Sequence, residues 1–191
     1  MYVSPWMQAC LLPRKWDVCG IIATPVTLWH SYILRTTGNP YMCGGPRDLN
    51  AASEALMYAA GGIAHGREMY IDPAYRAKWR AAVAKRMRRS TRDRIDAAVR
   101  EWVVESLRSP GHRELDGERK GTAVAAPVEW VLAEYVSGGD PARLDAAFDT
   151  PYVMANCLFD ARRNIAGEDT SLISEKDEER IDGKLARMAV A

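Results

Sequence analysis

The sequence predicts an all-α protein, a compact bundle of six to eight short helices in a single domain of residues 1–191. Apolar residues recur three or four positions apart over most of the chain, whereas segments that alternate with a period of two are scarce. Only residues 18–22 and 68–71 suit strands, and both are too short to build a sheet alone. Helix starts are marked repeatedly, because Thr or Asp can cap the first free amides and Pro fits the first helical position. The pairs that carry this signal are Thr24-Pro25, Asp72-Pro73, Asp140-Pro141 and Thr150-Pro151.

The N-terminal region is expected to be an arm followed by a helix. Residues 1–20 are rich in apolar side chains but interrupted by prolines, which predicts an irregular or briefly helical arm packed on the body. A helix is predicted from Thr24 to about residue 35, because Val26, Trp29 and Ile33 repeat at helical spacing and give it one broad apolar face.

Glycine and proline divide the next stretch. Gly38 ends the first helix, Asn39-Pro40 turns the chain, and Asp48 is expected to cap a second helix that runs to about residue 60. Residues 61–71 contain three glycines and are predicted to form a loop or a short turn of helix.

A strongly basic helix is predicted from Asp72-Pro73. It is followed by a helix up to residue 107 that is either new or continuous across Ser90-Thr91, and then by an exposed polar loop over residues 109–121. Residues 124–135 predict a helix that ends at the next glycines. Further helices are predicted from Asp140 through residue 148, from Thr150 to about residue 166, and from Ser174, in a capping box with Asp177, to about residue 188.

Composition limits the classes of function. The chain is 48% hydrophobic and 27% charged with a net charge of +1, so a polyelectrolyte role for the whole molecule is excluded. No apolar run approaches the ~20 residues that cross a bilayer, and residues 1–20 do not resemble a secretory signal. A cytoplasmic location without a membrane partner is therefore expected.

The cysteines and histidines do not have metal-site spacing. Cys10 and Cys19 could form a disulfide or join His30 in a metal site, but the favoured interpretation is that all four cysteines are small buried hydrophobic residues. His30 is interpreted as a hydrogen-bonded histidine in helix packing, and His65 and His112 as exposed loop residues. No metal or cofactor is expected.

Sequence motifs for catalysis are also lacking. The Gly44-Gly45-Pro46 stretch is not a phosphate-binding loop, and no serine stands in a nucleophile elbow. Glu101 and Glu105 lie one helical turn apart, as solvent-facing helix charges commonly do. We therefore expect no enzyme.

Residues 67–94 hold ten Lys or Arg against three acidic residues. A phosphate-binding helix is one interpretation. Tyr75 and Trp79, however, fall on the side that should face the core, so we favour a salt-bridged or solvated face and expect no nucleic-acid partner. The candidates for phosphate binding under the alternative are Arg80, Lys85, Arg86, Arg88 and Arg89.

Trp6 and Trp16 lie on the proline-broken arm, where few helical neighbours are available. Packing within the same molecule is the favoured interpretation. The alternative is a surface that docks a partner or another copy of this chain, because Trp is enriched among interface anchors.

Two stretches carry a family resemblance over about a third of the chain. The first is Pro25-x-Thr27-Leu28-x-His30, Gly38-Asn39-Pro40-Tyr41, Gly44-Gly45 and a capped helix from Asp48. The second is Ala147-Phe148-Asp149-Thr150-Pro151, an acidic run near Gly167-Glu168, and Ser174-Glu175-Lys176-Asp177. In this order they resemble small bacteriophage proteins that are usually assigned to tail assembly as chaperones of the tape-measure protein.

The resemblance implies a non-enzymatic tail assembly chaperone in the host cytoplasm. Such a protein would hold an aggregation-prone helix of the tape-measure protein, or of another tail protein, in an apolar groove along helix 24–35 and the turn after it. His30 and Asn39 would fix the turn. The groove and turn residues would be Trp29, His30, Tyr32, Asn39, Pro40, Tyr41 and Met42.

Two alternatives to the chaperone stay open. The chain could be a neck or tail structural protein retained in the virion. It could also be a nucleic-acid-binding or regulatory protein that uses the basic helix over residues 76–94.

Overall fold

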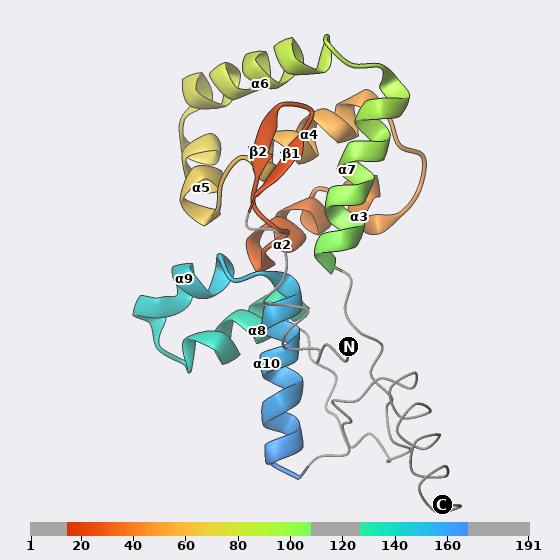
Figure 1. Cartoon of the computed structure of the whole chain (residues 1–191). Coiled ribbons are helices and arrows are strands. Elements are labelled where there is room, and N and C mark those ends of the chain that lie inside the picture. Colours follow the sequence, from red (N-terminus) through yellow and green to blue (C-terminus); the bar gives the residue numbers. More distant parts are fainter. Residues whose placement is uncertain (1–14, 108–126, 168–191) are drawn as a thin grey trace, which may run out of the picture.

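The computed structural model describes residues 15–107 and 127–167, and it confirms the all-α prediction with one small hairpin added. The elements in these ranges are β1 (Trp16–Val18), β2 (Ile21–Ala23), α2 (Leu28–Thr36), α3 (Pro40–Cys43), α4 (Leu49–Ala59), α5 (Ile63–Ile71), α6 (Pro73–Met87), α7 (Arg92–Leu107), α8 (Val128–Ser137), the 3-10 helix η1 (Pro141–Arg143), α9 (Leu144–Phe148) and α10 (Tyr152–Ile165). Figure 1 shows the hairpin and α2 to α7 forming one body, with α8 to α10 packed against its α2 end.

The strand expected at residues 18–22 becomes a two-stranded hairpin. β1 and β2 pair antiparallel with Val18 opposite Ile21, and Cys19 and Gly20 between them have φ of 56° and 77°. Two successive positive φ values are what a type I′ turn requires. A lone hairpin is marginal in water, but here its buried side chains pack against α4 and α7. Trp16, assigned to the arm from sequence, begins β1, while Trp6 lies outside the described residues.

The first helix begins three residues later than predicted. Thr27, not Thr24, is the N-cap of α2, and its side chain and His30 form a capping box. The carbonyl of Thr24 instead accepts a hydrogen bond from the Trp102 indole nitrogen at 2.7 Å. The N-terminal end of α2 is also tied to the C-terminal half, because the Leu28 amide donates to the Thr150 carbonyl at 3.0 Å.

Two connections predicted from sequence are helical. Residues 40–43 form α3, which Asn39 caps, and Asp48 caps α4 as predicted. Residues 61–71, predicted to form a loop or a short turn of helix, contain the nine-residue helix α5, and the strand candidate at residues 68–71 is wrong because it is part of α5. Gly62 has no side chain to cap α5, so the carboxylate of Asp149 accepts from the Ile63 amide at 2.7 Å.

The basic helix begins where predicted, since Asp72 accepts from the Ala74 amide at 2.8 Å. The chain turns at residues 88–91, so α7 is a new helix and not a continuation of α6. Gly138, with φ of 68°, ends α8 as predicted. The predicted loop over residues 109–121 and the last helix over residues 174–188 lie outside the described residues.

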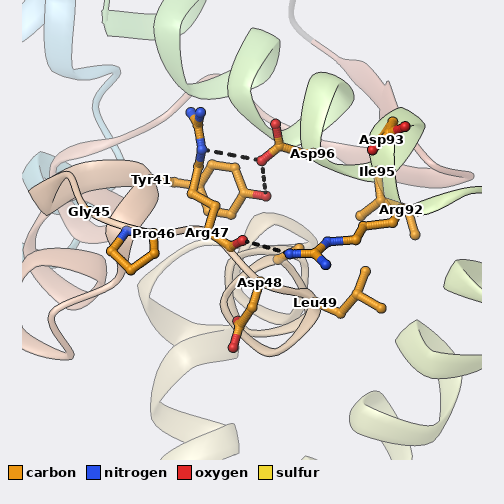
Figure 2. Close-up of a pocket in the computed structure, with 11 residues that line it drawn as sticks. Tyr41, Gly45, Pro46, Arg47, Asp48, Leu49, Arg92, Asp93, Ile95 and Asp96 are labelled. Carbon is orange, nitrogen blue, oxygen red and sulfur yellow. Dashed lines mark hydrogen bonds and ion pairs between the residues drawn. The ribbon is translucent and has the colours of Figure 1, made fainter.

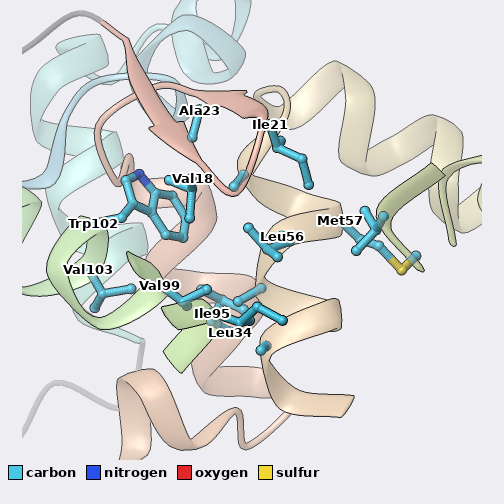
Figure 3. Packing of buried hydrophobic residues seen from close by; sticks show 14 of the residues in the cluster. Val18, Ile21, Ala23, Leu34, Leu56, Met57, Ile95, Val99, Trp102 and Val103 are labelled. Atoms are coloured by element: carbon cyan, nitrogen blue, oxygen red, sulfur yellow. The ribbon is translucent and has the colours of Figure 1, made fainter. Parts of the chain in front are cut away.

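Two large hydrophobic clusters and a small one on α10, formed by Val153 and Cys157, hold the described residues together, and α2 lies between the two large ones. The main core joins the hairpin, α2, α4, α6 and α7 around Leu56, Val99 and Trp102 (Figure 3). The second core joins α2 and the start of α5 to α8, α9 and α10. Its buried members are Leu28, Ile63, Leu132, Ala133, Ala147, Phe148 and Ala155.

Candidate functional site

Aromatic side chains converge at the open edge of the second core. Trp29 and Tyr32 stand three positions apart on α2 and so share one side of it. Trp130 from α8 meets the edge of Tyr32 at 6.1 Å between ring centroids and that of Phe148 from α9 at 4.9 Å. The interplanar angles of 86° and 78° are the edge-to-face geometry that aromatic pairs prefer. We call this site the aromatic cleft; its members are Trp29, Tyr32, Trp130, Leu144 and Phe148.

The aromatic cleft contains two adjoining cavities of about 200 and 560 Å³, which share Tyr32, Trp130 and Leu144. Trp130, one of the two tryptophans in the cleft, is 41% exposed. The larger cavity falls in the size range of ligand sites and is mostly apolar, with Glu134 and Asp140 at its edge. This arrangement suits an apolar ligand with polar groups at its margin.

A buried carboxylate sets the position of α8 on α2. Glu129 is only 2% exposed; it accepts a hydrogen bond from Ser31 Oγ at 2.7 Å and forms an ion pair with Arg35, whose Nε lies 3.1 Å from the same carboxylate oxygen. A buried charge needs such partners, because an unpaired carboxylate would lose its hydration without compensation. Trp130 is the next residue, so this network also orients the central ring of the aromatic cleft.

The floor and rim of the aromatic cleft come from α5. A Cβ atom at Gly66 would lie 2.2 Å from Cζ2 of Trp29, so only glycine lets the indole approach this closely. At the rim, the Arg67 guanidinium forms a two-pronged ion pair with the Asp145 carboxylate, at 2.5 and 2.6 Å, and so connects α5 to α9.

His30 is fully buried and fixes α2 to the end of α4. Its Nδ1 accepts from the Thr27 amide at 3.1 Å, so Nε2 carries the proton and donates to the Gly61 carbonyl at 2.8 Å and the Tyr58 carbonyl at 3.1 Å. Burial lowers the pKa of His30 below its ordinary value of 6.5, so the ring is neutral at pH 7.

The other histidines differ from one another. His65 was predicted to be an exposed loop residue, which is wrong, because it lies half-buried in α5 between the Tyr75 hydroxyl and the Met57 carbonyl, each at 2.9 Å. His112 lies outside the described residues.

The remaining groove residues predicted from sequence lie away from the aromatic cleft. Asn39 is buried and donates to the Ala51 carbonyl at 2.9 Å, which joins α3 to α4. Pro40 is the first residue of α3, and Tyr41 and Met42 are half-buried against the main core. The structure thus brings Trp29 and Tyr32 together but separates them from the turn.

Tyr41 belongs to a second, charged pocket of about 410 Å³ between the loop over residues 44–48 and α7 (Figure 2). Its hydroxyl donates to Asp96 Oδ1 at 2.9 Å, and Arg47 Nε lies 3.3 Å from the same oxygen. Burial, with a smaller contribution from Asp96, raises the pKa of Tyr41. The phenol therefore stays protonated and acts as a hydrogen-bond donor that ties α3 to α7.

The five phosphate-binding candidates do not form one group. Lys85, Arg86 and Arg89 line a cleft beside the hairpin, whereas Arg80 and Arg88 are exposed outside it. The ion pairs found among the described residues involve none of these five side chains. Salt bridging within the fold, one of the favoured interpretations, is therefore not found for these five side chains, although Arg67 in the same basic run pairs with Asp145.

Metal ligands do not cluster in the described ranges, where no three His, Cys, Asp or Glu side chains are placed to hold an ion. Cys157 is buried and Cys19 partly so, but Cys43 is exposed, so the prediction that all four cysteines are buried is wrong for Cys43. Cys10 lies outside the described residues. Across residues 15–107 and 127–167, no helix is long and apolar enough to cross a membrane.

Sequence reasoning missed the half of the aromatic cleft that α8 and α9 supply. The apolar residues around Trp130 repeat at helical spacing, as they do around core residues, so the sequence pattern alone predicts a core position for it. One signal was available: Glu129 shares a helical side with Leu132, Ala133 and Val136, and a carboxylate on an apolar side implies a buried partner.

No family model, curated protein or solved structure matches the chain.

Proposed function

We propose that this chain is a non-enzymatic assembly protein that binds an apolar helix of another protein in the aromatic cleft. The exposed indole of Trp130, beside about 560 Å³ of mainly apolar space, carries this proposal. A helix offers apolar side chains at intervals of three or four residues, and two adjoining cavities can receive two such side chains. Trp and Tyr at the centre of a contact are typical binding anchors.

Among assembly proteins, we propose a phage tail assembly chaperone that keeps the tape-measure protein soluble in the host cytoplasm. The resemblance that suggests this class includes Thr27 and His30. These residues cap α2, the helix that supplies Trp29 and Tyr32 to the aromatic cleft. The proposed contact and the family resemblance therefore fall on the same element.

The test is co-expression with the tape-measure protein encoded in the same genome. The wild-type chain should co-purify with that protein and raise its soluble fraction, and Trp130→Ala should abolish both effects. Tyr70→Ala is the matched control, because Tyr70 is 85% exposed on α5 and outside the aromatic cleft. A wild-type chain that neither co-purifies nor improves solubility would refute the proposal.

A further inference from the structure

A second large cleft lies on the main core, and none of its lining residues belongs to the aromatic cleft. Its walls are the hairpin turn, the C-terminal end of α6 and the first half of α7, and they enclose about 910 Å³. We call it the basic cleft. Its charged lining residues are Lys85, Arg86, Arg89 and Arg94, opposed by Asp17 and Glu101.

One of the four cations has a structural role. Arg86 Nε donates to the Gly20 carbonyl at 2.9 Å and so holds the hairpin turn against α6. Lys85, Arg89 and Arg94 form no ion pair with a carboxylate of the described residues. Four cations thus line one open space against two carboxylates, and three of these cations have no ion-pair partner among the described residues, which favours an anionic ligand.

The cations continue along α6 beyond the basic cleft. Lys78 and Lys85 are seven positions apart, which is two helical turns, so they lie on the same flank of α6. Arg76 and Arg80 lie on the other flank, because the core-facing Trp79 and Val83 come between the two sides. A row of cations that leads into a cleft matches a linear polymer of fixed negative charges better than a single small anion.

We propose that the basic cleft binds the phosphodiester backbone of nucleic acid without reading its base sequence. Arg and Lys are the usual partners of backbone phosphates, and such contacts position a nucleic acid without specifying bases. The residues that line the basic cleft include no aromatic side chain on which a base could stack. This activity is separate from helix binding at the aromatic cleft and uses none of its residues.

The first test measures binding of a fluorescein-labelled, mixed-sequence single-stranded oligonucleotide of about 20 nucleotides by anisotropy over a salt series. The double variant Lys85→Gln with Arg89→Gln removes two cations from the basic cleft. The matched control, Arg76→Gln with Arg80→Gln, removes the same charge from the opposite flank of α6.

The variant in the basic cleft should weaken binding about tenfold or more at low salt and lower the slope of log affinity against log salt by about 1.4. The control should stay within about twofold of the wild type. Equal losses of affinity in both variants would indicate that the oligonucleotide is attracted by net charge alone, and this would refute the proposed binding site. A wild-type protein without salt-sensitive binding would do the same.

A competition experiment shows whether the basic cleft prefers nucleic acid to a small phosphate anion or an acidic polypeptide. An unlabelled oligonucleotide should displace the probe far better than inorganic tripolyphosphate or polyglutamate at equal charge concentration. Tripolyphosphate that competed equally would replace the proposal with a small-anion site. Equal competition by polyglutamate would point to an acidic protein and would also refute the proposal.

Cys19 provides an independent readout, because it lines the basic cleft and is partly accessible. Saturating oligonucleotide should slow maleimide modification of Cys19 severalfold, as followed by peptide mass spectrometry. The exposed Cys43, outside the basic cleft, is the internal control and should react at an unchanged rate. Unchanged modification of Cys19 at saturation would place the nucleic acid elsewhere.

Discussion

Trp102 and Trp130 have similar neighbours in the sequence but differ in burial. Each lies on a helix among apolar neighbours, yet Trp102 is 0% exposed and Trp130 is 41% exposed. The Trp102 ring meets the edge of His30, and its nitrogen donates to the Thr24 carbonyl at 2.7 Å. The main core thus encloses Trp102 completely, whereas Trp130 stays partly exposed in the aromatic cleft.

This difference indicates what each region does. A closed core contributes to stability, because removing its side chains leaves a cavity. An exposed aromatic edge beside an apolar cavity contributes less to stability and is available for contact with another molecule. Substitutions in the two regions should therefore separate stability from binding.

The largest expected effect is that of Trp102→Ala. It should lower the free energy of unfolding by about 3–5 kcal/mol, since it removes a fully buried ring and its hydrogen bond. Trp130→Ala, in contrast, should cost about 1 kcal/mol or less, because that ring is only partly buried. Urea unfolding of both variants provides the measurement. Similar losses would mean that the aromatic cleft is a structural part of the fold.

Glu129→Ala should have the next largest effect, about 2–3 kcal/mol, because it leaves the buried Ser31 hydroxyl and the Arg35 guanidinium without their acceptor. Glu129→Gln keeps an oxygen acceptor for Ser31 and should cost about half as much. The variants are compared by chemical denaturation. Equal stability of Glu129→Ala and the wild type would show that this network does not hold α8 on α2.

Gly66→Ala should lower the free energy of unfolding by about 1–2 kcal/mol. Helix propensity alone would favour Ala by about 1 kcal/mol, but the added methyl group overlaps Trp29 and overpacking costs about 1–3 kcal/mol. The substitution should also shift the Trp fluorescence spectrum. A stabilised variant would mean that Trp29 moves away freely, and the floor of the aromatic cleft would then be adaptable.

His30 should add a pH dependence of stability. Since burial lowers its pKa below 6.5, the unfolded chain binds a proton between pH 6.5 and the lower folded pKa, whereas the folded chain does not. The free energy of unfolding should therefore fall as the pH drops below 6.5, by at most about 1.4 kcal/mol per pH unit, and His30 should contribute no slope above it.

His30→Gln is the control for this prediction. It should be less stable than the wild type at neutral pH, and the difference between the two should shrink as the pH drops below 6.5. A constant difference across this range would mean that His30 titrates in the folded protein as it does in the unfolded chain.

Local signals predicted most of the fold, and long-range contacts account for the errors. Asp48 and Asp72 cap the helices that directly follow them, so the sequence alone identified both starts. The start of α5 depends on Asp149, which is 86 residues away, and a window of neighbouring residues cannot include it. Half of the aromatic cleft was missed for the same reason, because Glu129 finds its partners on α2.

The contacts that complete α2 and α5 also determine when these helices can mature during synthesis. The Leu28 amide donates a hydrogen bond to the Thr150 carbonyl. The Ile63 amide donates to the carboxylate of Asp149, which is synthesised 86 residues later. At a ribosomal rate of about 5–20 residues per second, roughly 4–17 s separate the synthesis of Ile63 from that of Asp149. The starts of α2 and α5 therefore lack these two partners until the segment that contains Asp149 and Thr150 has been synthesised.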